Sequence, residues 1–198
     1  MDFNILIDPL PLSVCVGGRD VPISADFRTG ILFETMMFDR ELDKEEKILC
    51  ALDLYFPDGI PQPAHEAVDA LIWFYSCGND KKEQPSGGKG SGGSTKRCYD
   101  YDYDAPYIYS AFLSQYRIDL QDCVDLHWWK FMAMFLGLNE ENEICKIMEY
   151  RSVDLSKIKN KAEKERFARL KRRYALPDTR TAEQKQMDIG AILGGMIR

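Results

Sequence analysis

Hydrophobic and polar positions change their period near residue 25, from short β-type runs to helical spacing. Residues 13–24, SVCVGGRDVPIS, hold two such runs on either side of Gly17-Gly18, a dipeptide that supports a tight hairpin turn. A lone hairpin is marginally stable in water, so we expect it to pack on another element. The chain is therefore predicted to open with a β-hairpin.

Three helices are predicted between this hairpin and Gly78. Residues 27–38, FRTGILFETMMF, are apolar on nearly all sides, which is typical of a buried helix. Asp43 and Glu46 have the spacing of a capping box and are expected to open a second helix that stops at a Pro-Asp-Gly turn. The third helix, over about 64–77, is expected to end at the glycine.

A linker is predicted from the composition of residues 79–98, NDKKEQPSGGKGSGGSTKRC. It contains five glycines and three serines but no Leu, Ile, Val or aromatic residue. This composition is typical of a flexible tether, with a root-mean-square span of roughly 25 Å. We therefore predict two segments that can move independently, 1–78 and 99–198, and expect trypsin to cut first between them.

Helical patterns continue beyond the linker. Pro106 is expected in the first turn of one helix, where proline is tolerated. Asn139 is expected to open a short helix. Between them, a helix over about 125–137 is predicted to carry one apolar face, formed by Leu126, Trp129, Ala133 and Leu136. The predicted fold class is thus mainly α, with an N-terminal β-hairpin plus helices, a flexible Gly/Ser linker and a C-terminal helical segment.

The end of the chain carries a further amphipathic pattern. A capping box over 181–184 precedes an apolar stripe of Ile189, Ile192, Leu193 and Met196. Three glycines at 190, 194 and 195 weaken this helix by up to about 1 kcal/mol each relative to alanine. We expect it to form fully only when docked, either on its own domain or on a partner.

Charge is unevenly distributed along the chain. Residues 156–173 carry nine Lys or Arg against two Glu, although the formal net charge of the whole chain is −6. An acidic chain argues against a generic nucleic-acid binder. The basic segment has three interpretations: a solvated helix that packs through a thin apolar edge, a surface for an acidic protein, or a surface for nucleic acid or membrane. A surface for an acidic protein would use Lys164, Arg169, Arg172 and Arg173.

Tyrosine and aspartate alternate over residues 99–104. We predict a short extended segment that docks across a surface through one face of tyrosines, namely Tyr99, Tyr101 and Tyr103. The alternatives are a plain linker end and a calcium loop. The order of an EF-hand fails at Ala105, where that loop requires glycine.

The sequence contains no recognisable catalytic motif. No two of the six cysteines lie closer than 21 residues, so no zinc-binding pair exists, and we expect buried, reduced thiols. His65 and His127 are interpreted as a solvated and a packing histidine. GxSxG, Walker A and HExxH patterns are absent. We predict no catalytic residue, no metal and no cofactor, and neither a signal peptide nor a membrane span.

Several runs resemble a known family. They are YDYDAPYIYSAFLSQYRIDL, DLHWWKFMAMFLGL and YRSVDLSKIKNKAEKERFARLKRRYAL, together with ADFRTGILFETMMF and DKEEKILCALDLYFP nearer the N-terminus. These runs are similar to a small tail-gene protein of siphophages and prophages of Gram-positive bacteria. The most specific parts are residues 125–130 and the pair of tripeptides 150–152 and 154–156.

The resemblance implies a non-catalytic tail assembly protein. Such proteins resemble chaperones that bind the tape-measure protein and the tail-tube protein, and self-association is a further expectation. The expected location is the cytoplasm of the bacterial host, with no membrane contact and no place in the mature virion. The alternative is a nucleic-acid-binding regulator that uses residues 156–173. Partner contacts are expected at the three tyrosines, the four basic residues and the C-terminal stripe named above.

Overall fold

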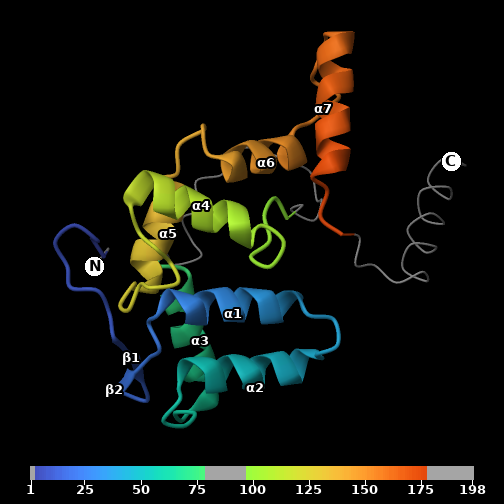
Figure 1. The fold of residues 1–198 in the computed structure, drawn as a ribbon. Coiled ribbons are helices and arrows are strands. Elements are labelled where there is room, and N and C mark those ends of the chain that lie inside the picture. The colour runs from blue at the N-terminus through green and yellow to red at the C-terminus, as the bar shows by residue number, and fades with distance from the viewer. Residues whose placement is uncertain (1–2, 79–96, 178–198) are drawn as a thin grey trace, which may run out of the picture. The chain divides into compact units, whose positions relative to one another are not determined.

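The structure, a computed structural model, describes residues 3–78 and 97–177 (Figure 1). Its elements are β1 (Ser13–Val16), β2 (Arg19–Pro22), α1 (Phe27–Phe38), α2 (Lys44–Tyr55), α3 (Ala64–Tyr75), α4 (Ala105–Tyr116), α5 (Trp128–Leu136), α6 (Glu143–Ser152) and α7 (Lys161–Arg173). The prediction of a mainly helical fold with an N-terminal hairpin is confirmed. The chain forms two compact units, Met1–Ser152 and Val153–Arg198, which are described separately.

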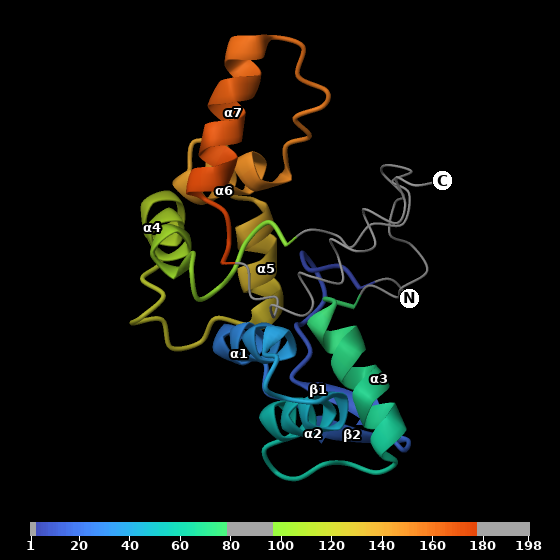
Figure 2. The same ribbon diagram turned by 90° about the vertical axis from the view of Figure 1, so that its right-hand side faces the viewer.

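The predicted hairpin is confirmed, with β1 and β2 antiparallel. Gly17 and Gly18 both adopt positive φ, 58° and 71°, which the two-residue turn requires. Gly17 is also held close to the chain before α3, because a Cβ on it would lie 2.7 Å from the carbonyl oxygen of Gln62. As expected, the hairpin does not stand alone, since β1 lies beside α3 (Figures 1 and 2).

Helix α1 covers the predicted residues but is not buried on all sides. Phe27, Gly30 and Phe33 face the core, whereas Leu32, Met37 and Phe38 are exposed. The expectation of complete burial is wrong because α1 packs on α2 and α5 along only part of its circumference. An apolar sequence cannot show how many neighbours a helix has.

The predicted boundaries of α2 and α3 agree closely with the structure. The Asp43–Glu46 capping box is present, with both reciprocal hydrogen bonds formed. Helix α3 ends at Tyr75, slightly before the expected glycine. Cys77 and Gly78 both have left-handed φ, 57° and 75°, and this conformation turns the chain out of the helix.

One hydrophobic core joins residues from both sides of segment 79–96, which lies outside the described residues. The ring of Phe131, on α5, is stacked between Phe27 of α1 and Phe112 of α4, at centroid distances of 5.2 and 4.9 Å. Gly30 is packed against the indole of Trp128 so tightly that a Cβ would lie 2.2 Å from it. The boundary expected at 79–98 therefore does not separate two cores, and the compact unit instead ends at Ser152.

Main-chain hydrogen bonds also join residues that lie before segment 79–96 to residues that lie after it. The N–H of Phe27 donates to the carbonyl of Leu126 at 2.9 Å, and the N–H of Trp128 donates to that of Ala25 at 2.7 Å. The guanidinium of Arg28, on α1, donates to the carbonyl oxygens of Leu120 and Cys123. The start of α1 is thus bonded to the loop that precedes α5.

We expect a chain cut once between residues 79 and 96 to stay together. The fragments share one core, so the apolar surface that separation would expose opposes dissociation. The measurement is size-exclusion chromatography after cleavage at a protease site inserted there, with the same digest in denaturant as the control. Two separate peaks under native conditions would instead support two independent segments.

Helix α5 begins three residues later than predicted, because His127 is its N-cap. The Nδ1 of His127 accepts the N–H of Trp129 at 3.0 Å, and its Nε2 lies 2.9 Å from the carbonyl oxygen of Pro11. This arrangement fits a neutral imidazole with its proton on Nε2. The prediction of a packing and hydrogen-bonding histidine is confirmed.

The structure gives His127 a pH-dependent contribution to stability. Burial lowers its pKa, and Lys130 acts in the same direction against the hydrogen bond to Pro11. In the unfolded chain the imidazole has its ordinary pKa of ~6.5. Because the folded pKa is lower, the unfolded chain binds more protons than the folded chain once the pH falls below about 6.5. We expect stability to fall as pH drops below about 6.5, and less steeply in His127→Asn, whose side chain can still cap α5. Thermal unfolding between pH 7.5 and 5 measures both slopes; equal slopes would contradict the assignment.

The predicted apolar face of α5 is only partly right. Trp129 is buried, as predicted, whereas Ala133 and Leu136 are exposed and the buried stripe consists of Trp128, Phe131 and Phe135. Trp129 packs against α3 and against the residues before β1. Its ring centroid lies 5.4 Å from that of Trp73, on α3, and 4.5 Å from that of Phe3.

The second unit is described by α7 and the segment before it. Asn160 caps the helix through its side-chain oxygen, which accepts the N–H of Glu163. Phe167 and Leu170 are half-buried, and no α7 side chain is fully buried. Lys171 donates to the carbonyl of Val153. None of the described helices is both long and apolar enough to span a membrane.

Candidate partner-binding surfaces

The tyrosines of the Tyr/Asp segment do not share one face. Tyr101 is only 4 % exposed, Tyr99 is half-buried and Tyr103 is exposed. The prediction fails because the segment turns: the Oδ1 of Asp100 accepts the N–H groups of Asp102 and Tyr103 at 2.8 and 3.1 Å. A turn breaks the two-residue alternation of an extended strand. Of the three tyrosines, Tyr103 is the one whose side chain is open to a partner.

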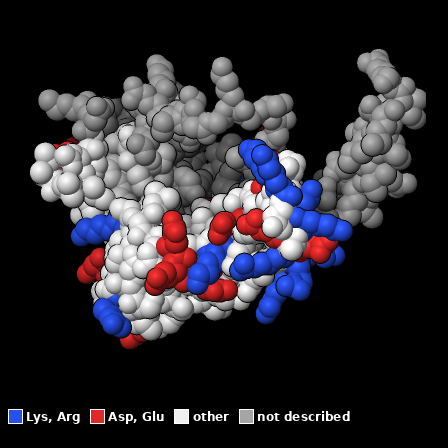
Figure 3. Space-filling model, turned by 90° about the horizontal axis from the view of Figure 1, so that it is seen from above, with Lys and Arg blue, Asp and Glu red and all other residues white. Residues whose placement is uncertain are grey.

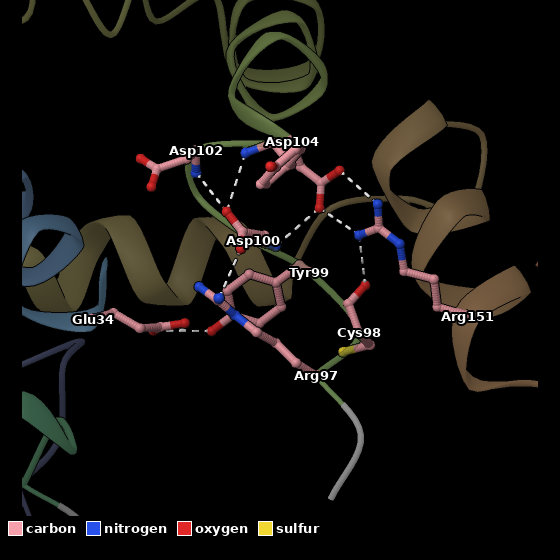
Figure 4. A network of polar contacts seen from close by, with 9 residues as sticks. Glu34, Arg97, Cys98, Tyr99, Asp100, Asp102, Asp104 and Arg151 are labelled. Carbon is pink, nitrogen blue, oxygen red and sulfur yellow. Dashed lines mark hydrogen bonds and ion pairs between the residues drawn. The ribbon is translucent and has the colours of Figure 1, made fainter. Parts of the chain in front are cut away.

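Two aspartates of this segment, Asp100 and Asp104, belong to a buried polar network (Figure 4). The carboxylate of Asp104 binds both terminal nitrogens of Arg151, at 2.5 and 2.9 Å, and also accepts the N–H of Asp100. Arg151 donates further to the carbonyl of Cys98. The pair connects the start of α4 to α6, so the Tyr-Arg-Ser tripeptide of the sequence has a structural role.

A buried carboxylate on α1 completes the network. Glu34 accepts the hydroxyl of Tyr75 at 2.6 Å. It also accepts the hydroxyl of Tyr99 at 3.2 Å (Figure 4). Burial and the nearby carboxylate both raise the pKa of the two phenols, which therefore stay protonated as donors. The tyrosines flank segment 79–96, so Glu34 bonds the chain on either side of it.

The network does not resemble a metal or acid–base site. Its carboxylates are already bonded to arginine, to tyrosine or to main-chain N–H groups. Across residues 3–78 and 97–177, no group of three or more His, Cys, Asp or Glu could hold a metal ion. The cysteines were expected to be buried, but Cys15 and Cys50 are exposed and the other four are half-buried. Each of the two is at a solvent-facing position of its strand or helix, which an apolar run does not reveal.

The four basic candidate residues, Lys164, Arg169, Arg172 and Arg173, are all exposed on α7. Figure 3 shows Lys and Arg side chains gathered around this helix. Lys161, Arg169 and Arg172 follow one another at spacings of eight and three residues, which places them on one side of the helix. The four candidate residues are thus accessible, and two of them, Arg169 and Arg172, share one side of the helix with Lys161. The C-terminal candidates Ile189, Ile192, Leu193 and Met196 lie outside the described residues.

Exposed apolar side chains cluster along the chain on either side of the α1–α2 turn. They are Leu32, Met37, Phe38, Ile48 and Leu49, each 43–57 % exposed, and are called the α1–α2 apolar residues below. The ammonium of Lys47 donates to the carbonyl of Met37, which holds the start of α2 against the end of α1. The guanidinium of Arg97 lies over the ring of Phe38 at 3.8 Å. Sequence reasoning missed the exposure of the α1 residues among them because it interpreted residues 27–38 as a helix buried on all sides.

A groove of about 540 Å³ lies between β1 and α3. Three residues of the strand and four of the helix line it: Ser13, Val14, Cys15, Glu66, Asp69, Ala70 and Trp73. The helical residues recur at i, i+3, i+4 and i+7, so they form one stripe opposite the strand. Nothing in the local sequence indicated the groove, because the packing of β1 on α3 creates it.

The described residues thus define a mainly helical protein with an aromatic core, and its accessible features are an apolar surface, a basic helix and a groove. The chain matches the family model of the bacteriophage Gp15 protein over residues 6–176. It therefore belongs to this bacteriophage protein family. No curated protein and no solved structure gives a significant match.

Proposed function

We propose that the protein is a non-catalytic tail assembly protein, a chaperone that binds the tape-measure protein, the tail-tube protein or both during tail morphogenesis. Membership of a bacteriophage family supports a role in the phage. The resemblance of residues 101–120, 125–138 and 150–176 to a small tail-gene protein supports the more specific role. We expect the protein in the host cytoplasm and not in the mature virion, which mass spectrometry of purified virions checks.

The observation that carries the proposal is the exposure of the α1–α2 apolar residues. Large apolar side chains that gather on a surface mark sites of protein contact. A tape-measure protein is a long helical polymer with apolar stripes, which would aggregate before the tube encloses it. An amphipathic helix buries such a stripe when its apolar face meets an apolar surface.

The test is co-purification with a fragment of the tape-measure protein after co-expression. The variant replaces Leu32, Ile48 and Leu49 with serine, and the control replaces the more exposed Val124 and Leu136 with serine. Exposed substitutions usually change stability by less than about 0.5 kcal/mol, so both variants should fold. We expect the first variant to lose at least about ten-fold in recovered fragment, as a few buried anchors dominate an interface.

Retention of the fragment by the triple-serine variant would exclude the α1–α2 surface. A second variant for the same co-purification test lacks residues 182–198, which carry the C-terminal apolar stripe. Loss of the fragment with an unchanged melting temperature would assign that stripe to the partner, whereas a lowered melting temperature would assign it to this chain's own core.

The basic face of α7 favours one alternative, a nucleic-acid-binding regulator. Such binding would weaken steeply as salt rises, because each neutralised phosphate releases counterions. Electrophoretic mobility shifts with DNA and RNA at two salt concentrations test it. We expect no shift at physiological salt, and a salt-dependent shift that Arg169→Glu with Arg172→Glu abolishes would replace the chaperone proposal.

A further inference from the structure

The groove between β1 and α3 has a strand edge along one wall. The N–H of Ile23 donates to the carbonyl of Leu12 at 3.0 Å, so residues 12 and 23 are a hydrogen-bonded pair of the hairpin. Hydrogen-bonded pairs alternate with non-bonded ones along an antiparallel ladder, so Val14 bonds to Val21. The main-chain groups of Ser13 and Cys15 therefore point away from β2.

These outward groups are open to a ligand. No hydrogen bond within the described residues, apart from the β1–β2 ladder, uses the N–H or C=O of Ser13 or Cys15. Both residues are exposed and both line the groove. Val14 lines it too, although its side chain is buried in the core, so the strand contributes main-chain atoms there. Two outward residues can exchange four hydrogen bonds with an added antiparallel strand.

The opposite wall determines which strand fits. Asp69 carries an exposed carboxylate with no hydrogen-bond or ion-pair partner in the described part of the chain. Glu66 uses one oxygen to accept the N–H of Gly17 at 2.7 Å, and its other oxygen has no hydrogen bond to any residue that the structure describes. Trp73 and Ala70 add apolar surface. The groove lies within the usual range for ligand sites, about 300–1,000 Å³.

We propose that this groove binds an extended segment of a partner protein that adds to β1 as a third strand and places a Lys or Arg side chain at Glu66 and Asp69. The main-chain hydrogen bonds would supply affinity, and the carboxylates would select for positive charge. A second copy of this chain fits less well, because pairing of two β1 edges brings like-charged carboxylates together. The inference goes beyond the proposed function and uses a different surface.

The probe is a synthetic strand, acetyl-Val-Lys-Val-Lys-Val-amide, added to the full-length, ¹⁵N-labelled protein. We expect saturable shifts of the Ser13 and Cys15 amide signals, with slowed hydrogen exchange at both. A peptide with Glu in place of Lys should bind at least about five-fold more weakly. A peptide with alternate N-methylated amides should not bind, since it cannot donate to the strand.

Two matched substitutions test the edge itself. Cys15→Pro removes an outward N–H at the groove, while Asp20→Pro removes the outward N–H of its cross-strand neighbour, on the other edge of the hairpin. Proline is tolerated where an edge N–H faces solvent, so both variants should fold, which their melting temperatures verify. We expect Cys15→Pro to weaken peptide binding at least about ten-fold and Asp20→Pro to change it less than about two-fold. Asp69→Asn should weaken binding about two- to five-fold.

Equal binding of the Lys and Glu peptides, equal loss in both proline variants, or no peptide binding would overturn the proposal. A peptide-free dimer that Cys15→Pro dissociates would overturn it in favour of a second copy. None of these outcomes involves the tape-measure fragment or the α1–α2 apolar residues, so the proposed function stands or fails separately.

Discussion

Replacing Asp104 with alanine is expected to lower the free energy of unfolding by about 3–5 kcal/mol, the usual cost of breaking a buried ion pair on one side. The side chains of Asp104 and Arg151 are 2 % and 9 % exposed, so solvent screens the pair little. The substitution leaves a buried guanidinium without its carboxylate. It also removes the acceptor of the Asp100 N–H. Urea unfolding measures the loss.

The exposed neighbour Asp102 supplies the matched control. Its side chain takes part in no hydrogen bond or ion pair given by the structure, so Asp102→Ala should change stability by less than about 0.5 kcal/mol. A double variant, Asp104→Leu with Arg151→Met, should recover much of the loss, because it removes both charges and fills the space. Equal stability of the Asp104 and Asp102 variants would show that the pair contributes nothing.

Trp129→Ala is expected to cost about 3–5 kcal/mol, the range for large aromatic truncations in a core. The indole lies within 6.0 Å of the rings of Phe3, Trp73 and Phe74, and its N–H donates to the carbonyl of Phe74 at 2.7 Å. Truncation opens a cavity and removes the indole N–H from that carbonyl, which then keeps the N–H of Cys77, at 3.1 Å, as a donor. Trp129→Phe should cost less, because it retains part of the ring contact.

Leu136, on the same helix, provides the control for this prediction. It was assigned to the same apolar face from the sequence but is 77 % exposed. Leu136→Ala should therefore leave the unfolding midpoint almost unchanged. A loss as large as that of Trp129→Ala would show that the face is buried as its periodicity suggested. An unchanged midpoint in Trp129→Ala would show that the indole is dispensable to the core.

Signals confined to a few neighbouring residues could be read from the sequence. The Gly17-Gly18 turn depends on positive φ at two adjacent positions, which glycine adopts without steric cost. The Asp43–Glu46 box satisfies N–H groups within a single helical turn. Both interactions are complete within their own segment. The positions of the hairpin and of α1, α2 and α3 therefore followed from local chemistry.

The exposed surfaces needed the tertiary structure. Leu32 and Phe33 are adjacent apolar residues on α1, yet one is exposed and the other is buried, because only one side of the helix has neighbours. Tyr101 and Tyr103 differ in the same way, since a turn built on Asp100 reverses the segment between them. The basic residues of α7 are accessible, as their charge predicts, because burial of unpaired charge is costly.

The sequence by itself determined where most described helices lie, which residues are charged and which family the chain resembles. It could not determine that residues on both sides of segment 79–96 share one core. That result depends on contacts such as Gly30 with Trp128 and Glu34 with Tyr99, which join positions about 100 and 65 residues apart. Linker composition shows that a segment has little to bury, whereas the packing of its flanks depends on the shapes of distant side chains.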